Sequence, residues 1–499
     1  MLISSRKKYD VVVIGSGVAA LSFIKYFNRL NCKNKCRPSL AIICKSQLTE
    51  TNTAWAQGGI AAVSNKDDNF EYHVQDTLIA GNFENNSCIV EKVIKEAPAL
   101  IKDLVDAGML FDQIDDLSYN LALEGGHSHK RIFHHKDITG QKLQDTLLKE
   151  TAQQVDVYEN QFVFDVKQDD FSSFHTFMLD KFNKCSEIVS SYVVIATGGL
   201  GMLYEKTTNQ PLTTGDGIYL GYNLGATIKD LSYVQFHPTG LYTKTDNCPL
   251  ITEALRGEGA ILLNIYGEPF MHKYDERKEL APRDIVSRGI FSEMQITNSN
   301  YAYLDATKLD NSIWENHFPF IYKTSLNNNI DPKSNPIPVV PTQHYSCGGI
   351  LSDEFGKTTV KNLYAIGEVA STGLHGSNRL ASNSLLEGLA FGKFAAENIY
   401  DSFIGNWNYS TSLIYQSNDF KLLDRKLLRK SISKFAGVIK SNQEMINLKI
   451  SLYNMIKTAD IIRQPNKNVI ENNIMYQVGL LLLEDAISKD YNSGVFYKI

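Results

Sequence analysis

The pattern of hydrophobic positions predicts a βαβ unit at the start of the chain. Residues 9–14 form a short β-rich apolar run, and a Gly-Ser-Gly turn follows at once at residues 15–17. Between residues 18 and 30 the apolar positions recur with helical spacing, and residues 39–44 form a second apolar run. A strand, a glycine turn, a helix and a second strand, joined by short connections, are typical of this unit.

Similar patterns return later in the chain. Residues 73–108 have a mainly helical spacing, and a strand-like run at residues 363–366 leads into a glycine. Further strand-like runs lie at residues 155–165, 174–179 and 191–196. Between about residues 235 and 343 the pattern is irregular, with several prolines and short predicted helices. Because βαβ-type segments occur on both sides of this region, we expect a nucleotide-binding domain that is interrupted by a second domain.

The last part of the chain, about residues 419–489, is rich in Lys, Leu and Ile at helical spacing and predicts a small helical bundle. The expected fold class is therefore α/β. A Rossmann-like domain (residues 1–234 and 345–410) is interrupted by an α+β domain (residues 235–344) and followed by a C-terminal helical domain (residues 415–499).

Composition narrows the class of protein. The net charge of −5 and the pI of about 6.2 argue against a nucleic-acid-binding protein. No apolar run approaches the roughly 20 residues of a membrane span. The seven cysteines are irregularly spaced and favour a reducing compartment over a disulfide framework, so we expect a cytoplasmic protein. Cys32 and Cys36 lack a second pair or a nearby histidine, and no metal site is expected.

The stretch from Thr372 to Gly392 is the most informative segment. It places Arg379 and a dense group of polar residues immediately before an apolar helical pattern. Ser384 and Glu387 have the spacing of a capping box, so a helix is expected to begin at Ser384. A helix N-terminus beside a guanidinium suits an anion or developing negative charge on a cofactor. An ordinary capped helix is the alternative, and it leaves the density of polar groups unexplained.

Glycine clusters at strand ends predict a large cofactor. Gly15, Gly17 and Ala20 match a dinucleotide fingerprint in its proper strand-to-helix context. The acid expected after the second strand is missing, and Lys45 stands there instead, able to reach a phosphate or to contact the ligand through its backbone. Further clusters occur at residues 56–60, 196–199 and 366–368. They favour a long ligand over a tight turn without one, because small residues let backbone approach the ligand at several points.

Longer motifs extend this picture over almost the whole chain. They include AWAQGGIAA, EGGHSHKRI, TGDGIYLG, QFHPTGLY, TEALRGEGA, LAPRDIVSR, HYSCGGI and LYAIGEVASTGLHGSNRLASNSLLE. The set resembles the flavoprotein family of fumarate reductases, succinate dehydrogenases and L-aspartate oxidases. The resemblance implies that the Rossmann-like domain binds FAD and that the inserted domain caps the substrate site.

The resemblance is nearest to the aspartate-oxidising branch of the family. It implies FAD-dependent oxidation of L-aspartate to iminoaspartate, the first step of quinolinate and NAD biosynthesis. Hydride passes from the substrate α-carbon to flavin N5, oxygen or fumarate reoxidises the flavin, and functional coupling to quinolinate synthase is possible. A soluble fumarate reductase or succinate dehydrogenase-type flavoprotein is the alternative, and a flavin-binding carrier without enzymatic activity is a third reading. No nucleic-acid or membrane partner is expected.

The residues can be weighed against aspartate, whose two carboxylates and one ammonium need several cationic donors and one anion. By resemblance, His237, His344 and Arg379 bind the carboxylates, and Thr252 belongs to the same substrate site. For each histidine alone, a structural role is the more common one. A glutamate at Glu124 stands where succinate- and fumarate-type relatives carry an aromatic residue, and it would pair with the ammonium.

Arg283 is expected to be catalytic. Pro282 predicts a helix N-terminus, where an arginine opposes the helix dipole, and a broken local rule is a mild indication of function. A surface arginine explains the pattern equally well. The resemblance implies that Arg283 exchanges a proton with substrate and is linked to Glu253 and Arg256.

The resemblance also supplies the cofactor contacts. Asn52 stands where membrane succinate dehydrogenases carry the histidine that bonds FAD covalently, so FAD is expected to be non-covalent. Leu123 and Ser232 depart from the family pattern. The expected cofactor-binding residues are Gly15, Ser16, Gly17, Val18, Ala19, Lys45, Asn52, Thr53, Ala54, Trp55, Ala56, Gln57, Gly58, Gly59, Asp216, Glu368, Ser384 and Leu385.

Overall fold

A seven-stranded, mostly parallel sheet is the central element of the structure. The computed structural model describes residues 3–31, 37–115, 118–151, 155–245, 248–403, 405–411 and 419–499. Strand β1 (Ile3–Ile14) lies between its parallel neighbours β2 and β10. The strand order is β7-β2-β1-β10-β9-β8, and β17, from beyond the irregular region, pairs in parallel with β10. The bounds are β2 Leu40–Ile43, β7 Asp156–Tyr158, β8 Phe162–Gln168, β9 Phe174–Leu179, β10 Cys185–Ile195 and β17 Leu363–Ala365.

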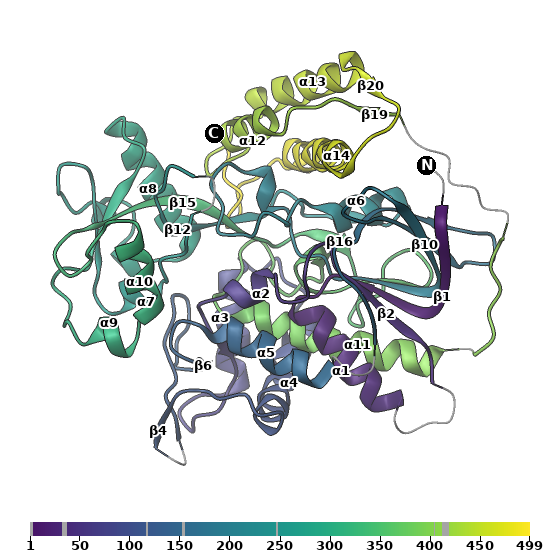
Figure 1. Cartoon of the computed structure of the whole chain (residues 1–499). Coiled ribbons are helices and arrows are strands. Elements are labelled where there is room, and N and C mark those ends of the chain that lie inside the picture. Colours follow the sequence, from purple (N-terminus) through teal and green to yellow (C-terminus); the bar gives the residue numbers. More distant parts are fainter. Residues whose placement is uncertain are drawn as a thin grey trace.

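Both faces of this sheet are covered. Alternate residues of a strand point to opposite faces. Val11 and Val13 accordingly belong to the core beneath helices α1 (Val18–Asn31) and α11 (Asn383–Ser402), whereas Val12 and Ile14 belong to the core shared with the C-terminal helices. Figure 1 shows these two layers on opposite sides of the sheet. The first layer also contains α2 (Asn52–Trp55), α3 (Phe70–Ala80), α4 (Ser87–Asp106) and α5 (Thr139–Thr151).

The irregular region of the sequence forms a second sheet with its own core. Four antiparallel strands lie in the order β12-β15-β14-β13, and buried Trp314 and Leu304 belong to a separate apolar cluster. Figure 1 shows this unit at one end of the molecule. Its elements are β12 (Val234–Leu241), α7 (Ala254–Gly257), β13 (Ile261–Leu263), α8 (Arg283–Ile296), β14 (Ala302–Asp305), α9 (Ile313–Asn316), α10 (Pro319–Asn327) and β15 (Ile337–Ser346).

Three helices follow at the C-terminal end, as the periodicity predicts. They are α12 (Arg425–Phe435), α13 (Asn442–Thr458) and α14 (Lys467–Ser488), joined by the short pair β19 (Phe420–Lys421) and β20 (Ile461–Ile462). Helix α14 packs against α6 (Asp216–Asn223). The remaining short strands are β3 Ile60–Ala61, β4 Gln113–Asp115, β5 Ser118–Tyr119, β6 Ile132–Phe133, β11 Ile228–Lys229, β16 Gly349–Leu351 and β18 Ala370–Ser371. The α/β fold class with a C-terminal helical region is thus confirmed.

The prediction of one strand over residues 155–165 is wrong. The apolar run at residues 155–165 forms two strands, β7 and β8, because Asn160 between them adopts a φ of 55° and turns the chain. Within the described ranges, no helix is long and apolar enough to cross a membrane, and no cluster of His, Cys, Asp and Glu side chains has a metal-binding arrangement. Cys32 and Cys36 lie outside the described residues.

Candidate active site

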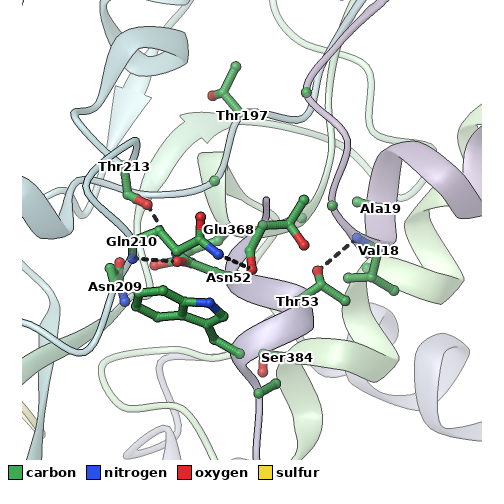
Figure 2. A pocket seen from close by; sticks show the side chains of 18 of the residues that line it. Val18, Ala19, Asn52, Thr53, Thr197, Asn209, Gln210, Thr213, Glu368 and Ser384 are labelled. Atoms are coloured by element: carbon green, nitrogen blue, oxygen red, sulfur yellow. Dashed lines mark hydrogen bonds between the residues drawn. The ribbon is translucent and has the colours of Figure 1, made fainter. Parts of the chain in front are cut away.

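The turn between β1 and α1 forms a cradle for a phosphate group. Gly15 adopts a φ of 117°, and a Cβ atom there would lie 2.1 Å from the carbonyl oxygen of Ala196. Only glycine fits this approach. The N-terminus of α1 follows, and Val18 N–H donates to Thr53 Oγ1 at 2.9 Å (Figure 2). Gly15, Gly17 and Val18 line the same cavity, so this helix N-terminus faces a space suited to a pyrophosphate.

Lys45, at the end of β2, is held in a buried cluster of acids. Its Nζ lies 2.6 Å from Asp216 Oδ2 and 2.5 Å from Glu471 Oε1, and it donates to Thr214 Oγ1 at 2.7 Å. Burial lowers the pKa of Lys45, but the two carboxylates raise it by more. The ammonium is therefore already paired with two carboxylates of the chain itself. Asp216 and Glu471 bring carboxylates to the strand end where the dinucleotide fold requires one.

Asn52 cross-links two segments of the cavity wall. Its Oδ1 accepts a hydrogen bond from Gln210 N–H at 2.8 Å, and its Nδ2 donates to Thr213 Oγ1 at 3.1 Å (Figure 2). Glu368, on the opposite wall, accepts from Ser346 N–H at 3.0 Å, and burial raises its pKa to about 7. Gly58 lines the same cavity as Asn52 and Glu368.

At the other end of the cavity, Arg283 and Glu253 form a buried ion pair. Arg283 Nε lies 2.6 Å from Glu253 Oε2, and Arg256 Nη2 lies 3.1 Å from Glu253 Oε1. Although burial raises the pKa of Glu253, the two guanidinium groups lower it to about 2. Arg283 is the first residue of α8, so the helix begins one residue after Pro282, which is its N-cap rather than its first residue. The three expected catalytic residues thus form one connected chain of charges.

Arg379 lies beside Arg283, and Gln235 joins them. Gln235 Oε1 accepts from Arg283 Nη1 at 3.3 Å and from Arg379 Nη2 at 3.2 Å. Arg379 Nη1 also donates to Ser384 Oγ at 2.7 Å. The two guanidinium groups therefore form one cationic wall. Gln235 stands in the QFHPT motif, but the sequence offers no signal for this bridging role.

The capping-box prediction at Ser384 is wrong. Helix α11 begins at Asn383, preceded by Ser382 with a φ of 60° and no side-chain cap. Glu387 does not turn back to the helix N-terminus, because Tyr345, Thr372 and His375 bind its carboxylate. The hydroxyl of Ser384 is instead taken by Arg379. Ser384 and Leu385 nevertheless line the cavity at the N-terminal end of the helix.

His237 and His344 lie together, with ring centroids 5.1 Å apart. Thr208 Oγ1 lies 2.7 Å from His344 Nδ1, and Thr239 N–H donates to His237 Nδ1 at 3.2 Å. Because His237 Nδ1 accepts, its Nε2 carries the proton. Burial, followed by the nearby guanidinium groups, lowers the pKa of both histidines well below the ordinary value. These shifts favour the neutral imidazole, so both histidines are suited to hydrogen bonding rather than to the cationic role expected from the sequence.

Glu124 faces the same space from the FAD-binding side. Its Oε2 accepts from Ser382 Oγ at 2.6 Å, and Oε1 lies against Gly58, where an added Cβ would be 3.1 Å away. Burial raises the pKa of Glu124, partly opposed by Arg283 and the Ser382 hydrogen bond. Neighbouring Leu123 is half exposed. The other departure, Ser232, donates to Asp485 of α14, so an acid reaches this position from a different element.

One cavity therefore contains most of the residues expected from the sequence. All of the expected site residues line it except Ala54, within α2, and Arg256, which lies behind Glu253. Sequence reasoning omitted other lining residues, several of which follow strand ends or carry small polar side chains: Thr51, Gln161, Thr197, Gly198, Thr208, Asn209, Gln210, Thr213, Tyr345 and Ser382. Thr197 and Gly198 had a signal, since they belong to a glycine cluster after β10.

The parallel sheet, the glycine cradle and the charged cavity define a flavoprotein oxidoreductase that uses FAD. A family model described as "FAD binding domain" matches residues 10–385. An L-aspartate oxidase of Clostridium perfringens is 40% identical over 444 residues, which cover 86% of this chain and 96% of that protein. The chain belongs to the L-aspartate oxidase family.

Three further comparisons place the chain within a wider group. A chloroplastic L-aspartate oxidase of Oryza sativa is 40% identical over 80% of this chain, and the chain spans 63% of that protein's length. It likewise spans 62% of a chloroplastic relative from Nicotiana tabacum. Among solved structures, FrdA of E. coli quinol fumarate reductase has a TM-score of 0.89 and 27% identity, covering 99% of this chain and 92% of that chain.

Proposed function

We propose that this chain oxidises L-aspartate to iminoaspartate, the first step of quinolinate and NAD biosynthesis. The observation that carries the proposal is Glu124, a buried acid that faces the same cavity as the guanidinium groups of Arg283 and Arg379. Two carboxylates need cationic and hydrogen-bonding partners, and one ammonium needs an anion. The names of the relatives support the same substrate.

The geometry supports a substrate-binding role for each of these residues. Arg379 presents a planar fork suited to bidentate binding of one carboxylate. His237 and His344, both neutral, donate hydrogen bonds, and Thr252 lines the same wall. Glu124 accepts from the ammonium through Oε1, while Ser382 holds Oε2. Contacts with the carboxylate and ammonium groups of the substrate would together orient its α-carbon.

The cofactor contacts fit FAD. The Gly15 cradle and the N-terminus of α1 would hold the pyrophosphate, and the acids around Lys45 would face the adenosine ribose. Ser384 and Leu385, at the start of α11, would face the ring system. When bound, FAD supplies the hydride acceptor, flavin N5. We also propose that FAD is held non-covalently, because Asn52 offers an amide and no nucleophile.

Arg283 is proposed to hold and exchange the substrate proton. Its Nε proton is shared with Glu253, whose own pKa of about 2 keeps it ionised, and Arg256 extends the chain of charges. An arginine has a pKa above about 12, so it releases a proton only to a strong base. In aspartate oxidation, Arg283 therefore acts chiefly by polarising the substrate, whereas proton donation matters in the reverse sense, when fumarate is reduced.

A direct assay separates this proposal from its rivals. The FAD-loaded protein is mixed with L-aspartate or with succinate, and flavin bleaching under nitrogen and peroxide formation under oxygen are followed. We expect reduction by L-aspartate. Reduction by succinate alone would establish the fumarate reductase alternative, and no reduction by either would establish a flavin-binding carrier. We further propose that oxygen or fumarate reoxidises the flavin, that the reactive imine is passed to quinolinate synthase, and that the protein is cytoplasmic.

A further inference from the structure

Glu387 is a fully buried carboxylate whose hydrogen-bond partner Tyr345 also contacts the Arg379 guanidinium. Its Oε2 accepts from Tyr345 Oη at 2.7 Å and contacts His375 Nε2 at 3.0 Å, and its Oε1 accepts from Thr372 Oγ1 at 2.6 Å. Burial raises the pKa of Glu387, but His375 and the hydrogen bonds outweigh this and keep the pKa below its ordinary value. A negative charge therefore sits at a fixed point inside the core, 1% exposed.

Tyr345 connects this charge to Arg379. The Arg379 guanidinium lies over the Tyr345 ring, 4.3 Å from its centroid. The Tyr345 and His375 rings meet edge to face at 87°, with Tyr345 Oη 3.2 Å from His375 Nε2. Tyr345 follows His344 on β15, so its ring is carried by a rigid strand. Two hydrogen bonds and one ring contact thus hold the plane of the Tyr345 ring, on which the guanidinium rests.

Arg379 itself has no acidic partner. Among the described residues, no carboxylate lies within ion-pair distance of Arg379, and its buried Nε has no hydrogen-bond acceptor. Burial, followed by Arg283, lowers its pKa. A buried cation without a counter-ion is costly, and an aromatic face is the neighbouring group that offsets part of that cost.

We propose that Tyr345, held by Glu387 and His375, is a positioning residue that fixes the Arg379 guanidinium for bidentate binding of a substrate carboxylate. The inference rests on the proposed function and deepens it. A phenol hydrogen-bonded to a carboxylate has a more electron-rich ring, which strengthens its attraction for the cation above it. Glu387 supports the positive charge through the ring without forming the ion pair that would occupy the guanidinium fork.

The test uses the FAD-loaded protein and succinate, whose binding is followed without turnover through the flavin absorbance. Three variants are compared: Tyr345→Leu removes the aromatic face, Tyr345→Phe removes only the hydroxyl, and Tyr364→Phe is the matched control. Tyr364 is equally buried and its Oη donates to Asn398 Oδ1 at 2.7 Å, but it does not line the cavity. FAD content and Tm are measured for each protein.

We expect Tyr345→Leu to weaken succinate binding by about 30-fold, as for a desolvated cation–π contact. Tyr345→Phe should weaken it by about threefold, and Tyr364→Phe should leave it unchanged. With L-aspartate, KM should rise more than kcat falls. Unchanged succinate binding in a folded, FAD-loaded Tyr345→Leu protein would overturn the inference. If that protein does not fold, Tyr345→Phe decides: binding equal to that of Tyr364→Phe would overturn it.

A double-mutant cycle tests the link to Glu387. If Glu387 acts through the phenol, Glu387→Gln should weaken succinate binding in the parent protein and add nothing in the Tyr345→Phe background. Additive losses would refute the link. Because succinate binding needs no turnover, the outcomes are distinguishable: a protein that binds succinate but does not oxidise L-aspartate contradicts only the proposed function, whereas a parent protein that binds no dicarboxylate contradicts the clamp itself.

Discussion

Replacing Glu124 with glutamine tests whether this carboxylate binds the ammonium group of the substrate. The amide has the same shape, and its oxygen can still accept the Ser382 hydrogen bond, now 2.6 Å long. What is lost is the charge facing the cavity. Hydrogen bonds to charged groups contribute about 1.5–3 kcal/mol. We therefore expect Glu124→Gln to lower kcat/KM for L-aspartate by about 10- to 150-fold.

Fumarate provides the internal comparison, because it carries two carboxylates and no ammonium. Fumarate reduction by the chemically reduced protein should be unchanged in Glu124→Gln, or faster, since one negative charge has been removed from the wall. Ser382→Ala serves as the control that keeps the charge and removes one neutral donor. It should cost about 1 kcal/mol, or roughly fivefold, with L-aspartate. Equal losses with both substrates in Glu124→Gln would refute the ammonium contact.

The pH dependence gives a second measure of the same contact. Burial raises the pKa of Glu124, and only the ionised form pairs with the ammonium. The kcat/KM for L-aspartate, which reports the free enzyme, should therefore rise with pH through that raised pKa. Glu124→Gln should abolish this limb of the profile. A limb that persists unchanged in the variant would assign the titration to another group.

Three further predictions concern the cofactor. Gly15→Ala should abolish FAD binding, because the new Cβ would lie 2.1 Å from a backbone oxygen, whereas Gly225→Ala, at a φ of 86° with open space around it, should retain FAD; equal FAD content would contradict this. Glu471→Gln should weaken FAD binding by about tenfold, because it disturbs the ion pairs of Lys45. The affinity is measured by flavin fluorescence titration. An unchanged affinity would exclude the C-terminal helices from the cofactor site. Denaturation should release free FAD if, as we propose, the cofactor is held non-covalently beside Asn52; flavin that migrates with the chain would contradict this proposal.

The sequence predicts the parts of the fold that depend on local periodicity. The β1–α1–β2 unit, the strand at β17 and the C-terminal helices all appear where the apolar spacing places them. The four-stranded sheet is different. Its strands are short or carry prolines, as at Pro338 and Pro341 in β15, and its pairing joins segments about 100 residues apart. Such pairing is decided by tertiary packing, which a local pattern does not contain.

The site residues likewise include some that the sequence predicts and some that it does not. Residues in long motifs, such as Arg379, were expected, and they line the cavity. The partners that set their chemistry were not. Glu387 fits the spacing of a local cap, yet three distant side chains bind it more completely than one backbone N–H could. Glu471 reaches Lys45 across 426 positions of sequence, a contact that no spacing rule predicts.

The distribution of charge partners in this cavity suits the dicarboxylate substrate that we propose. Arg283 and Lys45 are each paired with an acid of the chain itself, so a ligand gains little by approaching them alone. Arg379 differs: it is buried, it shares Gln235 with Arg283, and its guanidinium lies over the Tyr345 ring, with no carboxylate of the described residues within ion-pair distance. An incoming carboxylate supplies the missing counter-ion and offsets the repulsion between the two guanidinium groups at the same time. On the proposed function, affinity for the carboxylate comes from Arg379, whereas the distinction between an amino acid and a plain dicarboxylate comes from Glu124, which lines the same cavity.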